Sequence, residues 1–190
     1  MSTLELRELE PDDSRALRLL MSHAFGQGRI PEPPTEEPKK PEGTIGLFEG
    51  TALRAALTVR DFNIYWGAAG ERTMGGIAGV ATWAEARGRG LVDRLLVESL
   101  VRMKEKGQSL SALYPFAWAF YRKYGWEWVG ERANLTLPLR ELPKSRASVD
   151  LLEGEAAEAL VKSVYTRYTS GLHGPLTADT RDWKGRLDNS

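Results

Sequence analysis

The sequence predicts an α+β (α/β) domain in which a mixed, mostly antiparallel twisted sheet is flanked by helices. The first observation behind this prediction is a succession of three β-rich runs over residues 44–83, separated by turns at Glu49-Gly50 and at residues 67–70. Short turns between such runs are typical of antiparallel neighbours. The second observation is an amphipathic helical pattern over residues 91–107, followed by a further apolar run from Leu110. Helices therefore alternate with strands along the chain.

Each element is expected from its local pattern. Residues 4–10 alternate apolar and polar side chains, as a half-buried strand does, and the next segment begins with Asp12 and Asp13, which suit the positive end of a helix dipole. Gly107 follows the longest helical pattern as a C-terminal cap. The full expected order is strand 4–10, helix 11–25, strands 44–50, 51–67 and 71–83, helix 91–107, strand 110–116, helix 117–125, and one or two closing strands over 126–139.

The segment from Gly26 to Thr44 contains five prolines and mixed charge. Such a composition does not form a packed element and predicts a long exposed loop. A flexible linker within the domain is the favoured interpretation, and a lid beside a binding site is the alternative.

Composition excludes several kinds of site. Lys plus Arg equal Asp plus Glu at 26 each, so the chain lacks the excess of positive charge that nucleic-acid binders carry. It has no cysteine and only two histidines, His23 and His173, so neither a disulfide nor a metal site is expected. The acidic start of the chain does not resemble a signal peptide, and no apolar run has the length of a membrane span. A cytoplasmic protein without nucleic-acid or membrane partners is expected.

The turn Arg87-Gly88-Arg89-Gly90 stands between the third strand run and the long helix. A glycine-rich turn at a helix start directs free backbone N–H groups and the helix dipole at one point, which suits a phosphate or pyrophosphate. A tight turn with no ligand is the alternative. The turn contains neither G-x-G-x-x-G nor the lysine and hydroxyl pair of a P-loop, so a dinucleotide or a nucleoside triphosphate is not favoured.

The stretch "GGIAGVATWAEARGRGLVDRLLVESL" resembles motif A of the GNAT superfamily of N-acetyltransferases. The resemblance implies the GNAT acyl-CoA N-acyltransferase fold for residues 1–144 and acetyl-CoA as cosubstrate. It implies that the strand residues Val80, Ala81 and Thr82 bind the pantetheine of acetyl-CoA. It also implies that the turn and helix start bind the pyrophosphate, through Arg87, Gly88, Arg89, Gly90, Leu91 and Val92. Val92 departs from the small residue usual at its place.

The downstream "ALYPFAWAFYRKYGWEWVG" resembles the bacterial Eis-like (enhanced intracellular survival) acetyltransferases. That resemblance implies N-acetylation of a primary amine, such as an aminoglycoside, a polyamine or a lysine-like acceptor. Tyr121 matches the family's tyrosine, which protonates the thiolate of coenzyme A as it leaves. On residue type alone, Tyr121 and Tyr124 are equally typical of core aromatics. An acetyl-CoA-binding regulatory module with little or no turnover is the alternative function.

Residues 145–190 resemble the start of a second GNAT-like domain, truncated relative to the family, with a strand over 149–154 and helices over 155–170 and 177–187. Eis-like enzymes bring a C-terminal carboxylate from a third domain to the active site, so this chain is expected to bind acetyl-CoA better than it catalyses. An assembly of identical chains is one option.

No residue stands out as a general base, and His23 is expected to be a packing or surface residue. Six aromatic residues are candidates to line an amine pocket, although packing is favoured for most: Phe25, Trp66, Trp83, Trp118, Trp126 and Trp128.

Overall fold

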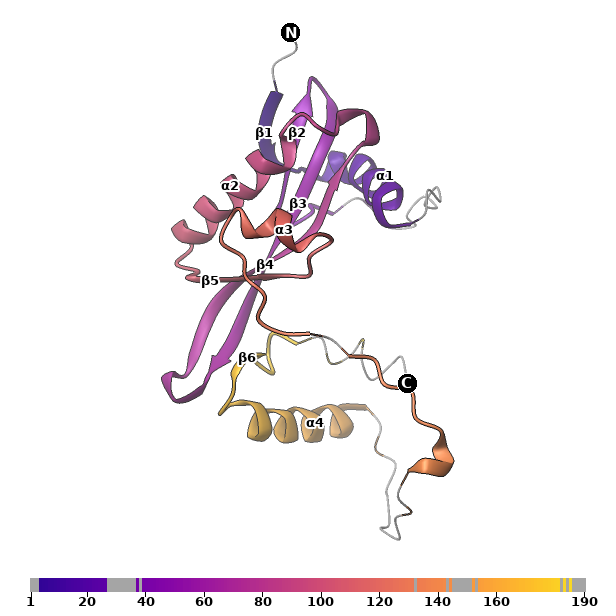
Figure 1. Ribbon diagram of the computed structural model, residues 1–190, viewed down its shortest axis with the longest axis vertical. Coiled ribbons are helices and arrows are strands. Elements are labelled where there is room, and N and C mark those ends of the chain that lie inside the picture. The colour runs from indigo at the N-terminus through magenta and orange to yellow at the C-terminus, as the bar shows by residue number, and fades with distance from the viewer. Residues whose placement is uncertain are drawn as a thin grey trace.

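The computed structural model of the 190-residue chain describes residues 4–26, 37, 39–131, 133–142, 144, 152, 154–181, 183 and 185. Its centre is a six-stranded sheet in the order β1-β2-β3-β4-β5, with β6 paired to β3 (Figure 1). All neighbouring strands are antiparallel except β4 and β5, which are parallel. The strands are β1 (Leu4–Glu8), β2 (Thr44–Glu49), β3 (Ala52–Trp66), β4 (Glu71–Thr82), β5 (Leu110–Leu113) and β6 (His173–Leu176).

Helices cover both faces of this sheet, and the predicted mixed sheet flanked by helices is confirmed (Figure 1). On one face, α1 packs through Leu20 against Phe48 and Ala81. On the other, α2 packs through Leu95 and Leu96, both fully buried. The α-helices of the described residues are α1 (Ser14–Phe25), α2 (Leu91–Glu105), α3 (Trp118–Arg122) and α4 (Gly154–Thr169), with 3-10 turns η1 (Pro11–Asp13), η2 (Gly67–Ala69), η3 (Ala84–Ala86) and η4 (Leu139–Glu141).

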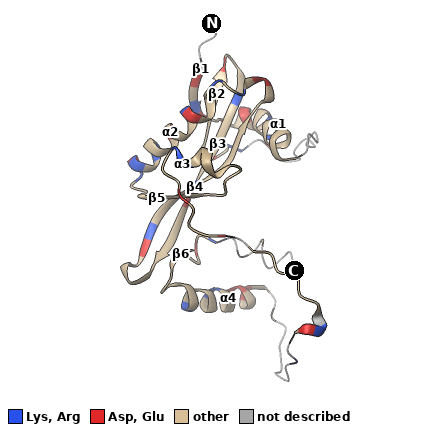
Figure 2. Cartoon of the chain, viewed as in Figure 1, with Lys and Arg blue, Asp and Glu red and all other residues tan. Residues whose placement is uncertain are grey.

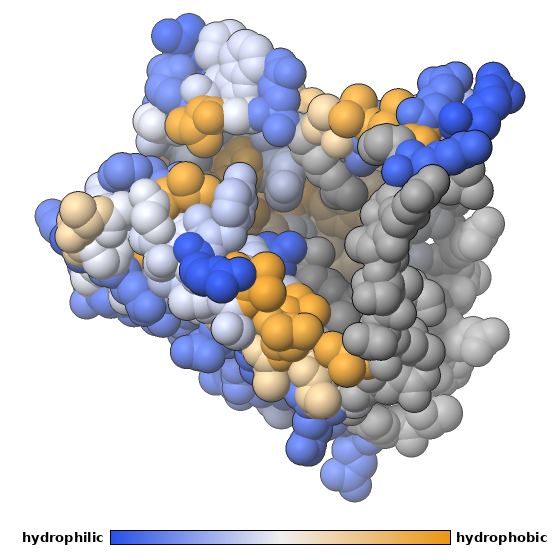
Figure 3. All heavy atoms as spheres, turned by 90° about the horizontal axis from the view of Figure 1, so that it is seen from below, coloured by the Kyte–Doolittle hydropathy of each residue, from blue (hydrophilic) through white to orange (hydrophobic). Residues whose placement is uncertain are grey.

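The long β3–β4 hairpin extends well beyond β5 (Figure 1). β2 pairs with the first half of β3, and β6 pairs with its last residues, at Ile64 and Trp66. The sequence pattern did not predict β6. Helix α4 confirms the helix expected over 155–170 and exposes Leu160, Val164 and Tyr168. Hydrophobic groups are visible at this end of the molecule in Figure 3.

The predicted closing strands over 126–139 are wrong for the described residues of that segment, which form neither a strand nor an α-helix. Val129 is 96% and Leu135 84% exposed. Alternation of apolar and polar side chains favours a strand, but a strand also needs a neighbouring strand with which to pair. The nearest one in sequence, β5, is only four residues long. The strand expected over 110–116 ends earlier, at Leu113, because Pro115 has no N–H to donate to a ladder.

Other predictions fall at the limit of what is described. Most of the strand expected over 149–154 lies outside the described residues, and Gly154 already belongs to α4. Residues 177–181 form a turn rather than the start of a helix, and most of 182–187 lies outside the described residues. Among the described residues, no helix is both long and apolar enough to cross a membrane.

Candidate functional site

Among the residues that the structure describes, the end of β4 has a strand neighbour on one side only. β5 pairs with β4 from Met74 to Ile77, whereas β4 continues to Thr82 beside β3. The final residues of β4 therefore present an open backbone edge on the side of β5. Such an edge can bind an extended ligand that carries amide groups.

The direction of the backbone at this edge follows from one hydrogen bond. The Trp83 N–H donates to the Arg54 carbonyl oxygen at 3.1 Å, and Ala81 pairs with Ala56 of β3. Because backbone groups alternate in direction along a strand, the N–H and C=O of Thr82 point away from β3. The Thr82 backbone thus faces the open side.

A bulge precedes these residues. Ala78 pairs with Thr58 and Ala81 with Ala56, so Gly79 and Val80 together lie opposite the single residue Leu57. Gly79 has φ +58°, a left-handed conformation that glycine adopts without strain. The bulge sets the direction of the strand end, while Val80 packs on the α2 side of the core.

The Thr82 hydroxyl is buried and has no hydrogen-bond partner among the described residues. A buried hydroxyl left without a partner costs about 1–3 kcal/mol. The residue whose backbone faces the open edge therefore also carries an unsatisfied buried polar atom.

The turn after β4 directs free N–H groups outward. Gly88 and Gly90 both have left-handed backbones, with φ +72° and +70°, and Gly90 is the N-cap of α2. Among the described residues, the N–H groups of residues 88–93 find no acceptor, and the first helical bond is Arg94 N–H to the Gly90 carbonyl. Unengaged N–H groups at a helix N-terminus, together with the helix dipole, are typical of an anion-binding site.

The side chains of Leu91 and Val92 pack into the core at this turn. Leu91 is buried in the core between α2 and the sheet, and Val92 packs on the same core. Their side chains fix the first turn of α2 to the sheet, so only their backbone N–H groups remain available to a ligand. The larger Val92 side chain is accommodated by this packing.

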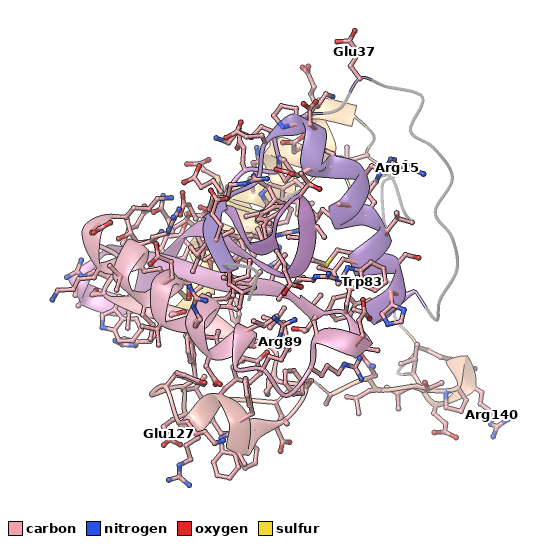
Figure 4. All side chains as sticks on the ribbon, turned by 90° about the horizontal axis from the view of Figure 1, so that it is seen from above. Arg15, Glu37, Trp83, Arg89, Glu127 and Arg140 are labelled. Atoms are coloured by element: carbon pink, nitrogen blue, oxygen red, sulfur yellow. The ribbon has the colours of Figure 1, made fainter. Side chains whose placement is uncertain are left out.

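The two arginines of the turn differ in their surroundings. Arg87 is exposed, and no ion pair to a described residue engages it. Arg89 instead donates to the Glu49 carboxylate at the end of β2, with a distance of 3.2 Å from Nη2 to Oε1. In Figure 4, Arg89 lies well inside the outline of the molecule, whereas Glu37 and Arg140 lie at its rim. Sequence alone gave both arginines the same role.

Tyr121 of α3 has a buried ring, with 3% of the residue exposed. The rings of Phe116, Phe120 and Trp126 surround it at centroid distances of 5.3, 5.3 and 6.2 Å. Burial raises the pKa of the phenol above its ordinary value. The hydroxyl makes no hydrogen bond to a described residue and is not among the atoms sealed from solvent. Because its pKa is raised, the phenol is protonated at neutral pH.

Tyr121 lies on the same side of the sheet as α2. It belongs to the core cluster that contains Ile77 and Leu91, against which Val80 and Val92 also pack. The structure therefore brings Tyr121, the end of β4 and the start of α2 to one face of the domain.

The other aromatic candidates divide by location. Trp83 directly follows the open edge and stacks on His23 of α1, with ring centroids 4.9 Å apart. Trp126 is a core residue that donates to Ser111. Away from this group, Phe25 is exposed, Trp66 contacts His173, Trp118 lies beneath Arg122, and Trp128 donates to the Gly130 carbonyl. Only Trp83 among the six adjoins Thr82 in sequence and packs beside it.

Acidic and basic residues are interspersed over the described part of the chain rather than gathered on one face (Figure 2). A surface hollow of about 550 Å³ lies between β1 and the outer side of α2, lined by residues that include Leu6, Val97 and Arg102. None of the predicted site residues lines it. Sequence analysis missed Glu49 and Arg54 as part of the site, and the only signal was their position on a predicted hairpin.

Comparison with known proteins assigns the family. A model of the acetyltransferase (GNAT) domain matches residues 5–129. An uncharacterized N-acetyltransferase of Streptomyces griseus is 27% identical over 154 residues, which cover 75% of this chain and 36% of that protein. The chain thus spans little more than a third of the length of that relative.

Solved structures agree on the fold. A conserved protein of unknown function from Enterococcus faecalis, a probable N-acyltransferase, has a TM-score of 0.55 at 26% identity, covering 65% of this chain and 32% of that one. Eis1 from Mycobacterium abscessus has a TM-score of 0.55 at 14% identity, covering 65% and 31% respectively. At that identity the likeness to Eis1 concerns the fold alone. With the domain model matched from β1 to α3, across the open β4 edge and the glycine turn, the chain belongs to the GNAT acetyltransferase family.

Proposed function

We propose that this chain transfers an acetyl group from acetyl-CoA to a primary amine. One observation carries the proposal: the strand end with the open edge at Thr82, the start of α2 with its unengaged N–H groups and the ring of Tyr121 all border one core cluster. A matching ligand has three parts: an extended chain with amide groups for the open edge, an anion for the N–H groups, and a leaving group that takes a proton from Tyr121. Acetyl-CoA combines all three.

The described residues fit this cosubstrate. Thr82 has both backbone groups available to amide groups of the pantetheine. The N–H groups of residues 88–93 suit the pyrophosphate, and Arg87 adds a positive charge beside it. When bound, acetyl-CoA supplies the acetyl thioester. Val80 and Ala81 shape the edge, with Ala81 packed into the core on the α1 side.

Tyr121 has the chemistry of the proton donor. As the amine nitrogen bonds to the acetyl carbon and the carbon–sulfur bond breaks, the sulfur takes the proton of the Tyr121 Oη. A positioned acid of this kind accelerates a reaction by about 10²–10⁴-fold. Because burial raises the pKa of the phenol, Tyr121 holds this proton throughout the neutral range. The phenolate left on Tyr121 is neutralised when solvent or the acetylated amine supplies a proton to Oη.

The acceptor is proposed to be a small amine of the aminoglycoside, polyamine or lysine-like kind, after the resemblance of "LYPFAWAFYRKYGWE" to Eis-like enzymes. Trp83 adjoins the open edge and is the residue we propose to contact it. The proposal places the protein in the cytoplasm, where acetyl-CoA is available. Residues 145–190 are proposed to begin a second GNAT-like unit, with the exposed stripe of α4 as part of its core.

The test is calorimetric titration with acetyl-CoA, followed by a thiol-release assay with spermidine, kanamycin and a lysine peptide. Binding together with thiol release from at least one amine is expected. Binding without release from any amine would favour a regulatory acetyl-CoA-binding module. Absence of binding would refute the proposal.

A further inference from the structure

The turn Arg87–Gly90, which is proposed to bind the pyrophosphate, contains one side chain that is placed to hold its shape. Arg89 lies between Gly88 and Gly90, both in left-handed conformations. Glycines leave the chain many alternative conformations, so a turn bounded by two of them stays in one shape only if something fixes it. No described atom lies within 4 Å of a Cβ placed on Gly88, so packing does not fix the turn there.

Glu49 provides the attachment. Its Oε1 accepts a hydrogen bond from Arg89 Nη2 at 3.2 Å, and its Oε2 accepts one from Arg54 Nε at 3.0 Å. Both carboxylate oxygens are therefore engaged. The Glu49 side chain is 19% exposed, which makes this pairing less solvated than a typical surface ion pair. Glu49 ends β2, so the attachment leads directly into the sheet.

Arg54 extends the same network to the other flank of the turn. Its guanidinium lies 3.7 Å from Glu85 Oε1 in η3, and its backbone carbonyl accepts the Trp83 N–H. Residues before and within the turn are thus tied to one hairpin. Two arginines and two carboxylates share the network, so its positive charge is largely neutralised within the protein.

We propose that Glu49 is a positioning residue for acetyl-CoA, and that Arg89 anchors the turn instead of binding the pyrophosphate. Glu49 holds Arg89, Arg89 holds the backbone between the two glycines, and the N–H groups of residues 88–93 stay aimed at one point. Arg87, which no described carboxylate engages, is the cation for the phosphate. This inference rests on the proposed function.

The test compares two acyl donors in Glu49→Gln. Acetyl-CoA carries the pyrophosphate, whereas S-acetylpantetheine lacks it. The variant is expected to raise the KM for acetyl-CoA about fivefold, the effect of an ion pair at the strong end of the surface range, with kcat unchanged. The kcat/KM for S-acetylpantetheine is expected to stay the same, because that donor does not use the turn. A general loss of structure would lower both.

Glu98→Gln is the matched control. It removes the same charge from a comparable pair on α2, where Glu98 accepts Arg102 Nε at 2.8 Å, and neither donor should be affected. Arg89→Gln breaks the anchoring pair from its other side and should repeat the effect of Glu49→Gln. The double variant Glu49→Gln/Arg89→Gln should be no worse than either single variant, because both remove one interaction.

An unchanged KM in folded Glu49→Gln, or an equal loss with both donors, would overturn the inference. Failure of the proposed function shows differently, as absence of acetyl-CoA binding by the unchanged chain. Amide hydrogen exchange without ligand then decides on Glu49: residues 88–93 should exchange faster in Glu49→Gln than in Glu98→Gln, and equal rates would overturn the positioning role.

Discussion

Gly79 of β4 lies against Met21 of α1, and a Cβ atom placed on Gly79 would stand 3.4 Å from the Met21 sulfur. The space tolerates a methyl group, but the backbone at φ +58° does not favour one. We expect Gly79→Ala to lower the free energy of unfolding by about 1–2 kcal/mol, the strain of a left-handed residue that has a side chain. It should also weaken acetyl-CoA binding, because relief of the strain would redirect the strand end at Thr82. Chemical denaturation and calorimetry measure the two effects.

Gly50→Ala is the control for this prediction. Gly50 has a similar φ of +62° in the β2–β3 turn, with no atom within 4 Å of a placed Cβ. It should lose comparable stability and keep its affinity for acetyl-CoA. Equal affinity losses in both variants would show that the bulge has no special part in binding.

Gly90→Val should weaken binding of acetyl-CoA and free coenzyme A alike, by roughly tenfold or more, because a β-branched residue disfavours the left-handed N-cap and displaces the pyrophosphate from the N–H groups. Gly107→Val serves as control, since Gly107 has φ +73° beyond the other end of α2. Calorimetry with both ligands measures the effect. If folded Gly90→Val binds as tightly as the unchanged chain, the assignment of the turn is wrong.

Tyr121→Phe should lower kcat by about 10²-fold or more while the KM for acetyl-CoA changes little, because the hydroxyl acts only as the thiolate departs. Stability should be unaffected, since the hydroxyl bonds to no described residue. Tyr124→Phe removes a hydroxyl from a neighbouring ring of the same aromatic cluster and should keep full turnover. Steady-state assays decide: normal turnover by Tyr121→Phe would make Tyr121 a packing residue.

Acid should weaken the fold through Asp13. The Arg7 guanidinium, bonded to both carboxylate oxygens at 2.6 and 3.0 Å, holds the pKa of Asp13 below its ordinary value. Because the pKa of Asp13 is lower in the folded state, the ionised carboxylate stabilises the fold at pH values above the unfolded-state pKa of about 3.9. This stabilisation is lost as the pH falls through the folded-state pKa. Asp13→Asn should therefore be about 1–2 kcal/mol less stable at neutral pH, and the difference should vanish in strong acid.

Asp61→Asn is the comparison for that measurement. The pKa of Asp61 is also lowered, chiefly by its hydrogen bond from Lys106, but the carboxylate is largely exposed and its pairing contributes little. Denaturation curves between about pH 2 and 7 should separate the two variants. A pH-independent loss in Asp13→Asn would contradict the linkage.

Local patterns predicted the elements that bury one face. The helix over 91–107 was recognisable because Leu95, Leu96 and Met103 recur at helical spacing, and all three are buried. The turn at Arg87–Gly90 was recognisable as a candidate anion site because its glycines precede that helix. Both features depend on residues close in sequence.

Long-range pairing could not be predicted in this way. β6 is short and contains Gly174 and Pro175, and it forms a strand because the far end of β3 offers a free edge. Residues 126–138 show the opposite case. Trp128 and Val129 belong to a strand-like pattern, but among the described residues no strand pairs with them. The bond between Glu49 and Arg89 joins residues 40 positions apart and depends on β2 and β4 both pairing with the start of β3.

Amide hydrogen exchange with and without acetyl-CoA tests the central claim most directly, because it reports on the backbone groups that the account assigns to the ligand. Saturating acetyl-CoA should slow exchange at Thr82 and at residues 88–93, while free coenzyme A should protect the same amides. Amides of the distal β3–β4 hairpin, such as those of residues 68–72, should not change. Protection confined to other segments, or none despite measured binding, would contradict the account.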